Sequence, residues 1–480
     1  MFLQAATYAY LALPWLIFLT GWLRPEWAGI FTVLLLWGSV QFLRGLGPDP
    51  VAPPGRGRWW LVLLVLALVW VSLSGAGGMG FQNLPDWGDK NAILKDLTLR
   101  PWPVVYPRTQ FGDGPATLVY YFALYLPASV AGKALGWIPA QIFLYVYVLA
   151  GSFLALAWFS LLAGGGKARA ALLFVFLSGL DSLGCLLTPG SSPRDFTSHL
   201  EWWSPFFQYS SNTTLLFWVP QHALAGWLAA ALVHHQGFEH KDLRNVVWIC
   251  ALITLWSPYV ALGLAMLVIG IGVLRHGKGL LTVQNTGAAA ALAGLALAFF
   301  YRAPRGEEEG LGLGGSTLAA YALFLLLEVG VFALALLPGI RERLGREARL
   351  YLLLLVVLLA ILPWCRYGEG NVMMRASIPV LFCFWLFVAR TLFQPGSWTA
   401  RIALLAGLCI GAITPAFEMS RSIAHYRAHP EPLEDVQGVT ELEGNVFTRT
   451  FLAPTDSCFM RRLARRTAMT RNHLTHSTRL

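Results

Sequence analysis

Charged residues are scarce in this sequence, and their scarcity excludes most classes of soluble protein. Only 12% of the 480 residues are Asp, Glu, Lys or Arg, whereas 56% are hydrophobic. A soluble domain usually carries about 25% charged residues. Apolar stretches of roughly 20 residues, the length that spans a bilayer as a helix, recur from one end of the chain to the other. The sequence therefore predicts an integral membrane protein of the all-α class, a polytopic transmembrane helical bundle.

Signatures of nucleotide, metal and disulfide chemistry are also missing from the sequence. There is no Walker A motif, and no GxGxxG follows a predicted strand. The six Cys lack CxxC or His/Cys metal spacing, so no metal site is expected. Whether Cys365 and Cys458 form a disulfide is left open. The net charge of +10 reflects Lys and Arg in short loops, which orient a membrane protein. We therefore expect no nucleic-acid partner.

The apolar stretches give a series of predicted spans and two ambiguous segments. The predicted spans are residues 4–23, 27–43, 59–78, 138–162, 170–187, 215–233, 281–300, 317–337, 350–364, 377–389 and 402–417. The segment 117–137 is apolar but contains Pro127 and Lys133. The segment 246–274 is too long for one plain span.

The distribution of positive charge decides between two topologies, because cytoplasmic loops are enriched in Lys and Arg. In the first, 117–137 does not cross and 246–274 is a hairpin of two short crossings that turns at Ser257-Pro258. In the second, each segment crosses once, and four basic residues move outside: Lys167, Arg169, Lys241 and Arg244. The first topology fits better. Both predict about 13 crossings in the inner (plasma) membrane, with the N-terminus cytoplasmic and the C-terminus outside.

This topology predicts a simple domain organisation. Residues 1–420 form the transmembrane domain, which includes a large outer loop with juxtamembrane helices over 79–137. Residues 421–480 form a small polar tail outside the membrane, either a cap or a disordered end. The polar, motif-like stretches of the chain then gather on the outer face.

An acidic stretch of the outer loop, residues 83–97, is the first candidate site. An amphipathic helix here would lie in the membrane interface and hold carboxylates at the surface. The same residues are also typical of a helix start, with Asp86 as N-cap and Asp89 at N3, and the spacing alone favours this interpretation. A capping Asp can still face a ligand, so Asp86 and Asp89 are the candidate catalytic residues. The apolar face of this helix would carry Trp87, Leu94 and Leu97. Its acidic face would carry Asp86, Asp89 and Asp96.

A late outer turn, residues 364–379, is the second candidate site. It places Arg366, Glu369, Asn371 and Arg375 between two predicted spans. A planar guanidinium pairs with two oxygens of a phosphate, so these residues suit a phosphate-bearing substrate. Snorkelling to the interface, or an ion pair with Glu369, is an equally good interpretation. Arg375 is the stronger candidate because it directly precedes an apolar helix.

Polar residues in or beside predicted spans form the third group of candidates. Polar side chains at membrane depth usually face the protein interior or a cavity. They contact a substrate or, more commonly, bond to another helix. Glu328, a lone charge in the predicted span 317–337, is expected to be protonated or paired. The candidate substrate-binding residues of this group are Asp181, His199, Glu201, Gln221 and His222.

Taken together, these features resemble the GT-C superfamily of integral membrane glycosyltransferases, in particular its bacterial members. In this sequence, a span is followed by a long outer loop that opens with Pro85-Asp-Trp-Gly-Asp89 and continues through Trp102-Pro-Val-Val-Tyr-Pro107. A juxtamembrane apolar helix over 118–127 follows, and a late outer turn carries Met374-Arg-Ala-Ser-Ile-Pro379. The chain departs from the pattern in having two spans before the one that leads into the loop, and only a small C-terminal tail.

The resemblance implies a function and assigns roles to residues. The catalytic base on the acceptor hydroxyl would be Asp86, with Asp89 as second choice. The donor would be a hexose or pentose on a polyprenyl phosphate in the membrane lipid, with Arg375 and Arg366 binding its phosphate. Such a donor needs no nucleotide cofactor, and metal dependence stays open. The expected function is sugar transfer to an acceptor at the outer face of the cell envelope.

Two other functions remain open. A transporter or flippase for a lipid or anionic solute would have discontinuous helices and paired charges within the membrane. The break at Ser257-Pro258, Asp181 and Glu328 favour this alternative. A non-catalytic subunit that assembles the envelope is the other alternative.

Overall fold

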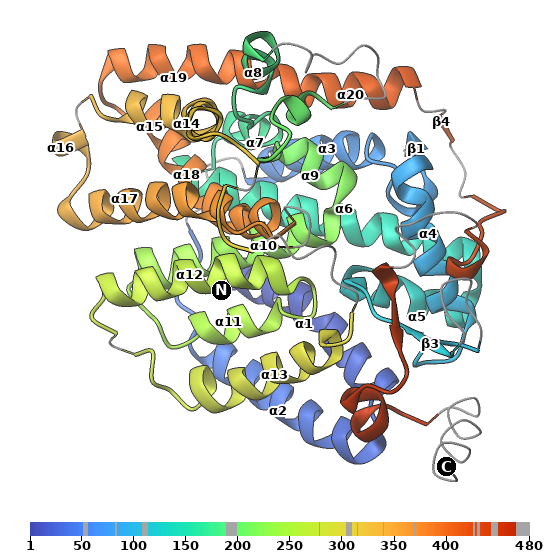
Figure 1. Cartoon of the computed structure of the whole chain (residues 1–480). Helices are drawn as coiled ribbons and strands as arrows, with labels where there is room; N and C mark the ends of the chain where they lie inside the picture. Colours follow the sequence, from blue (N-terminus) through green and yellow to red (C-terminus); the bar gives the residue numbers. More distant parts are fainter. Residues whose placement is uncertain are drawn as a thin grey trace.

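The computed structural model consists mainly of helices that lie side by side (Figure 1). Among the described residues, seven helical segments are long and apolar enough to cross a membrane, as the predicted helical membrane bundle requires. They are Phe2–Trp22, Pro25–Arg44, Trp137–Gly164, Leu318–Leu336, Arg346–Trp364, Asn371–Phe393 and Trp398–Ala424. The structure describes residues 1–50, 56–81, 84–107, 114–164, 166–188, 199–277, 279–303, 310–313, 315–338, 340–367, 371–425, 428–429, 433–442 and 450–466.

The elements follow one another in this order. The first helices are α1 (Phe2–Trp22), α2 (Pro25–Arg44), α3 (Arg56–Ser72), α4 (Leu84–Leu99), α5 (Leu126–Leu135), α6 (Trp137–Gly164), α7 (Ala168–Val175), α8 (Asp181–Leu187), α9 (Asn212–Trp218) and α10 (Pro220–Val233). The later ones are α11 (Val246–Leu252), α12 (Pro258–Leu274), α13 (Ala289–Phe300), α14 (Leu318–Leu325), α15 (Val331–Leu336), α16 (Ile340–Arg343), α17 (Arg346–Ile361), α18 (Asn371–Phe393), α19 (Trp398–Gly411) and α20 (Ile413–His425). The strands are β1 (Gly80–Phe81), β2 (Val105–Tyr106), β3 (Ala116–Leu118), β4 (Ala428–His429) and β5 (Leu452–Pro454).

Burial separates a central helix from a peripheral one. In the most apolar part of α18, 89% of the residues are buried, whereas in that of α2 only 17% of the residues are buried. α18 packs against α6, α10, α12 and α17, so protein surrounds it. The exposed side chains of α2 include Val33, Leu36 and Val40, which suits contact with lipid tails that are as apolar as leucine.

Helix α1 separates the two ends of the described chain. Its 21 residues span roughly 31 Å at about 1.5 Å per residue. At its start, the Met1 ammonium pairs with Asp49 at 2.7 Å. At its end, the Trp22 carbonyl accepts from the Arg465 backbone N–H at 2.7 Å. The N-terminus and the C-terminal segment therefore lie at opposite ends of α1.

The outer loop returns to the face from which it leaves. Trp59, early in α3, donates to Ser160 at 3.3 Å, and Ser72, at the end of α3, bonds to Tyr145 at 2.8 Å. Helices α3 and α6 are therefore antiparallel, and α6 begins at the end of the bundle where α3 stops. The intervening chain, which includes 117–137, therefore starts and ends at the same end of the bundle, as the preferred topology requires.

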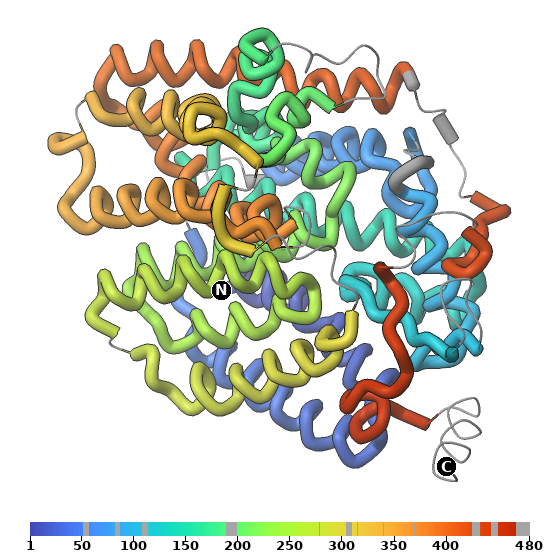
Figure 2. The backbone as a smooth tube through the Cα atoms, in the orientation of Figure 1, coloured from blue at the N-terminus to red at the C-terminus, as the bar shows by residue number. Residues whose placement is uncertain are grey.

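Two small sheets hold the C-terminal segment against this loop, and the sequence analysis did not predict them. β4 pairs antiparallel with β1, and β5 pairs antiparallel with β3, which also pairs with β2. In this register Thr117 lies opposite Val105 on one side and Ala453 on the other. Figure 2 shows the red C-terminal tube beside the blue-to-cyan segment that holds α4 and α5. In its described part, the predicted tail is thus a cap.

The segment 246–274 forms two adjacent helices, α11 and α12, but α11 is shorter than either of the two predicted crossings requires. α11 and α12 lie side by side, with the Cys250 thiol bonded to the Ala261 carbonyl at 3.3 Å. Ser257 caps α12 by accepting from the Val260 N–H. The Trp256 indole donates to the Leu11 carbonyl, in the middle of α1, at 3.0 Å. The seven residues of α11 span only about 10 Å, too little to cross a bilayer. The count of about 13 crossings stays a prediction.

Two predicted spans are interrupted helices. The span 170–187 forms α7 and α8, and the span 215–233 forms α9 and α10. The second break falls at Val219, with φ −140° and ψ 53°, because the following Pro220 disfavours a helical conformation at the residue before it. Asp181 and His222 both lie in the first turn after a break. Broken helices therefore place these polar side chains in the bundle.

Candidate functional site

The strongest candidate site lies where the outer loop, which contains α4, meets α10, α12 and α18. We call it the arginine–histidine site and define it by Lys90, Tyr121, His222, Tyr259 and Arg375. His222 and Tyr259 belong to the first turns of α10 and α12, and Arg375 belongs to the second turn of α18. Tyr121 directly precedes the turn Phe122–Tyr125. Five segments that are far apart in the sequence thus contribute to one site.

His222 is the most enclosed member of the site. Its side chain is fully buried, and its ring centroid lies 5.0 Å from that of Tyr121. Among the described residues, neither Nδ1 nor Nε2 of His222 has a hydrogen-bond partner. The great majority of buried polar atoms in proteins form hydrogen bonds, so a buried polar atom without one needs an explanation. A neutral imidazole offers one donor and one acceptor, so His222 is equipped to bind a polar ligand.

Arg375 brings a positive charge to the same place. Its Cζ atom lies 5.7 Å from the Tyr121 ring centroid and 5.9 Å from that of Tyr259, so cation–π contacts hold the guanidinium. Within the described part of the chain, Arg375 forms no ion pair and its Nε has no hydrogen-bond partner. The donors of a guanidinium match the oxygens of a phosphate. Arg375 therefore has the geometry of an oxyanion-binding residue.

The site is electropositive. Arg375 and Lys90 both act electrostatically on His222, and the Lys90 side chain is buried 5.3 Å from the Trp87 ring centroid. Burial raises the pKa of Tyr121 far above its ordinary value, even though the Arg375 charge partly lowers it. The Tyr121 phenol therefore stays a neutral hydrogen-bond donor at pH 7. Two cations and a neutral donor together favour an anionic ligand.

Helix α4 carries the acidic stretch to this site. Trp87, Leu94 and Leu97 are buried, as the helical pattern predicts. Helix α4 packs on α5 and α6, and its position in the membrane interface stays a prediction. The Trp87 indole donates to the Phe217 carbonyl, at the end of α9, at 3.0 Å. This contact fixes the first half of α4 beside α9 and α10.

The carboxylates of α4 differ in their roles. Asp96 is structural, because it accepts from Arg100 Nε at 2.9 Å, from the Tyr106 hydroxyl at 2.6 Å and from the Val439 N–H at 3.0 Å. Asp89 is half-buried and precedes Lys90 of the site. α4 begins at Leu84, so Asp86 lies in its first turn and not at the predicted N-cap. The Asp86 side chain lies outside the described residues.

Gln221 links the site to the C-terminal cap. Its Nε2 donates to the Tyr120 hydroxyl at 3.2 Å, and its Oε1 has no partner among the described residues. The Tyr120 ring packs against that of Phe451, with 4.5 Å between centroids. The Val119 N–H donates to the Phe451 carbonyl at 2.8 Å. The cap therefore covers one side of the arginine–histidine site.

The other residues predicted in the late outer turn have separate surroundings. The Arg366 guanidinium lies 5.5 Å from the Phe206 ring centroid, and the Arg366 backbone N–H donates to the Gly310 carbonyl. Asn371 is the first residue of α18. Glu369 lies outside the described residues. Arg375 is thus the one residue of this group that the structure brings to His222 and α4.

A second polar cluster, the carboxylate network, contains Asp181, Glu201, Glu328 and Glu418. All four side chains are buried. Asp181 accepts from three donors, Ser178 at 2.8 Å, Trp203 at 3.3 Å and Thr414 at 3.0 Å. Glu201 accepts from the Ser211 N–H at 2.9 Å and from Gln208 at 2.8 Å. Glu328 bonds to Asp181, so the predicted lone charge has a partner. For Asp181, interhelical hydrogen bonding is the interpretation that these contacts support.

His199 connects this network to the end of α20. Its Nδ1 bonds to Glu418 at 2.9 Å, and Trp218 and Arg421 also contact Glu418, at 3.1 Å and 3.7 Å. Burial and the nearby Asp181 charge raise the pKa of Glu201 to about 8. Asp181, His199 and Glu201 thus lie in one buried network, which was not predicted, and each is bonded to neighbouring protein groups.

The sequence analysis missed three members of the arginine–histidine site. Lys90 was a Lys inside the acidic stretch, and Tyr121 and Tyr259 were single aromatics among many. Tyr259 follows the Ser257-Pro258 break, which was a signal of a helix end at a site. Among the described residues, no group of three or more His, Cys, Asp or Glu side chains is arranged to hold a metal ion.

Comparison with known proteins supplies no relative. No protein-family model, curated protein or solved structure matches the chain.

Proposed function

We propose that the chain is a glycosyltransferase that moves a sugar from a polyprenyl-phosphate donor to an acceptor at the outer face of the membrane. The observation that carries the proposal is the arginine–histidine site. Among the described residues, Arg375 has no ion-pair partner and buried His222 has two unbonded ring nitrogens, and Lys90, on the helix of the acidic motif, acts electrostatically on His222. A phosphate beside a polar, uncharged sugar matches this combination of a cation and neutral donors.

The mechanism follows from the roles of these groups. The acceptor hydroxyl transfers its proton to the carboxylate of Asp86, or of Asp89, as its oxygen bonds to the anomeric carbon of the donor. The bond between that carbon and the phosphate oxygen breaks at the same time, and polyprenyl phosphate leaves. Arg375 and Lys90 stabilise the negative charge that develops on the leaving phosphate. His222, Tyr121 and Gln221 orient the sugar through hydrogen bonds.

The test is sugar release in membranes that contain the full chain. Short-chain synthetic polyprenyl-phosphate hexoses and pentoses serve as probes, and release of polyprenyl phosphate is measured. We expect Asp86→Asn to slow release by about 100-fold or more, since the removal of a general base usually costs 100- to 10,000-fold. Asp89→Asn tests the second choice. Asp456→Asn, an exposed position in the C-terminal cap, is the matched control. Full activity of both Asp86→Asn and Asp89→Asn would exclude the mechanism.

A transporter or flippase for a lipid or anionic solute is the second candidate. It is favoured by the helix break at Val219, the short helix α11 and the two buried carboxyl groups of Asp181 and Glu328, since discontinuous helices are typical of transporters and ionisable groups at membrane depth often mark a substrate or ion pathway. A transporter would move a fluorescent polyprenyl-phosphate lipid between the leaflets of a proteoliposome without cleaving it. Asp86→Asn would leave such movement almost unchanged.

A further inference from the structure

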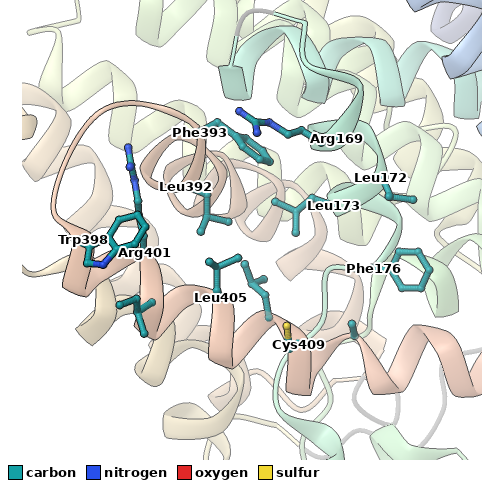
Figure 3. A pocket seen from close by; sticks show the side chains of 13 residues that line it. Arg169, Leu172, Leu173, Phe176, Leu392, Phe393, Trp398, Arg401, Leu405 and Cys409 are labelled. Carbon is teal, nitrogen blue, oxygen red and sulfur yellow. The ribbon is translucent and has the colours of Figure 1, made fainter.

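A groove lies at the other end of the bundle, between α7, the end of α18 and α19 (Figure 3). Its volume is about 560 Å³. Apolar side chains line most of it, among them Leu173, Leu392 and Leu405. We call it the α7–α19 groove. Arg375 lies near the start of α18 and Phe393, in the groove wall, at its end, so roughly 27 Å of helix separates the groove from the arginine–histidine site.

Arginine side chains mark one end of this groove. Arg169 and Arg401 both line it, and in Figure 3 their guanidinium groups lie at the same end, above Leu173 and Leu405. Arg169 Cζ lies 4.9 Å from the Phe393 ring centroid. Arg401 Nε donates to the Thr391 carbonyl at 3.4 Å. The groove thus has an apolar body and a cationic end.

The cations at this end have no carboxylate partner within the described ranges. In the described part of the chain, Lys167, Arg169 and Arg401 form no ion pair with a carboxylate, whereas nearby Arg390 pairs with Glu239. Lys167 Nζ donates to the Phe393 carbonyl at 2.8 Å and so stays close to the groove. Clustered basic residues next to a membrane-exposed apolar surface attract anionic lipid head groups.

The outer wall of the groove is open to the membrane. Leu172, Ile402 and Leu405 each expose about half of their side chains, and Trp398, at the start of α19, is 71% exposed. Trp is enriched at the level of the lipid head groups. The ligand class that matches an apolar channel, an interfacial Trp and unpaired arginines is a phospholipid with an anionic head.

We propose that the α7–α19 groove binds an anionic phospholipid of the surrounding membrane. One acyl chain lies along Leu173, Leu392 and Leu405, and the phosphate lies between Arg169 and Arg401. This site is separate from the arginine–histidine site, and its occupancy does not depend on the proposed sugar transfer.

The experiment is native mass spectrometry of the purified full chain in a neutral detergent. Phosphatidylglycerol and phosphatidylcholine with identical acyl chains are the probes. We expect phosphatidylglycerol to be retained about tenfold more strongly, since each Lys or Arg near a membrane surface contributes a substantial electrostatic attraction. Arg169→Gln with Arg401→Gln removes this preference. Arg169→Lys with Arg401→Lys keeps most of it, which shows that the variants fold.

Two control variants separate lipid binding in this groove from effects of the total charge and of the total hydrophobic surface. Arg341→Gln with Arg346→Gln removes the same charge from exposed positions around α16 and leaves the preference unchanged. Leu405→Trp fills the groove and lowers retention of both lipids, whereas Val33→Trp on the exposed face of α2 does not. Equal retention of both lipids by the unaltered chain, or an equal loss in the Arg341/Arg346 variant, would overturn the proposal. Displacement of phosphatidylglycerol by an equal concentration of polyprenyl phosphate would also overturn it.

Discussion

Two of the buried polar clusters of this protein, the carboxylate network and the arginine–histidine site, differ in how many of their polar groups have hydrogen-bond partners within the protein. In the carboxylate network, Asp181 accepts from three donors, and Glu201 and His199 each have bonded neighbours, whereas Glu328 bonds to Asp181 but keeps Oε1 without a partner among the described residues. In the arginine–histidine site, His222 and Arg375 keep polar atoms without partners among the described residues. A satisfied network stabilises the fold, whereas an unsatisfied one is completed by something that binds.

The difference has a physical consequence for each cluster. Removal of a bonded carboxylate leaves several buried donors without an acceptor, which costs stability. Removal of an unbonded polar group leaves nothing unpaired, so its loss affects function alone. The same kind of substitution is therefore expected to have opposite effects in the two places.

The largest expected effect is the loss of sugar transfer when Arg375 is replaced. Arg375→Gln removes the cation that stabilises the leaving phosphate, and we expect the rate to fall by about 100-fold, as for the loss of one oxyanion-stabilising donor. The rate of polyprenyl-phosphate release measures this. Arg302→Gln, at a half-exposed arginine side chain, is the control. An unchanged rate in the Arg375 variant would remove the phosphate-binding role.

Next in size is the destabilisation caused by loss of Asp181. Asp181→Ala leaves Ser178, Trp203 and Thr414 without their buried acceptor. We expect a loss of about 2 kcal/mol in unfolding free energy, seen as a lower midpoint of thermal unfolding in detergent. The rate of transfer per folded molecule stays the same. If that rate falls with no change in the midpoint, Asp181 belongs to a functional site.

Replacement of His222 is expected to separate function from stability. His222→Phe keeps a buried ring but removes two unbonded nitrogens, so the unfolding midpoint stays the same or rises. Transfer falls about tenfold if one hydrogen bond to the sugar is lost, since roughly 1.4 kcal/mol corresponds to a factor of ten. His199→Phe is the matched comparison and lowers the midpoint because Glu418 loses a partner. A lower midpoint for His222→Phe together with an unchanged midpoint for His199→Phe would contradict the proposed difference between the two clusters.

A smaller, pH-dependent effect is expected at Glu201. Its pKa is raised from 4.5 to about 8, so between these pH values the folded protein holds a proton that the unfolded chain has lost. The contribution of Glu201 to stability is therefore complete below about pH 4.5 and is lost as pH rises toward 8. The slope for one proton is at most about 1.4 kcal/mol per pH unit. Glu201→Gln flattens the pH dependence of the unfolding midpoint, and an unaltered slope would count against the raised pKa.

Much of the bundle was predictable because long apolar runs leave little choice of structure. The segments that form α1, α2, α6 and α18 stand out by hydrophobicity alone. Positive charge in the loops favoured a topology in which 117–137 does not cross, and α3 and α6 are arranged as that topology requires. The helix breaks at Val219 and before Asp181 were not predicted: Pro220 was a local signal for the first, but a proline ends some helices and only kinks others.

The site was predicted in part, for reasons that lie in its long-range contacts. Arg375 and His222 were candidates because a polar group in an apolar setting is conspicuous. Their closeness to each other depends on how α10 packs against α18, which no local pattern encodes. The pairing of β5 with β3, which places Phe451 over Tyr120, joins segments more than 300 residues apart. The same long-range contacts distinguish Asp181 and Glu201, which are bonded internally, from His222.

The most direct test of the central comparison is the affinity of the purified full chain for short-chain polyprenyl phosphate. We predict that Arg375→Gln weakens binding by about tenfold or more, since a charged hydrogen bond contributes roughly 1.5–3 kcal/mol. Asp181→Asn, at the satisfied carboxylate network, leaves the affinity unchanged. Equal affinities in the unaltered chain and the Arg375 variant, or an equal loss in both variants, would contradict the account.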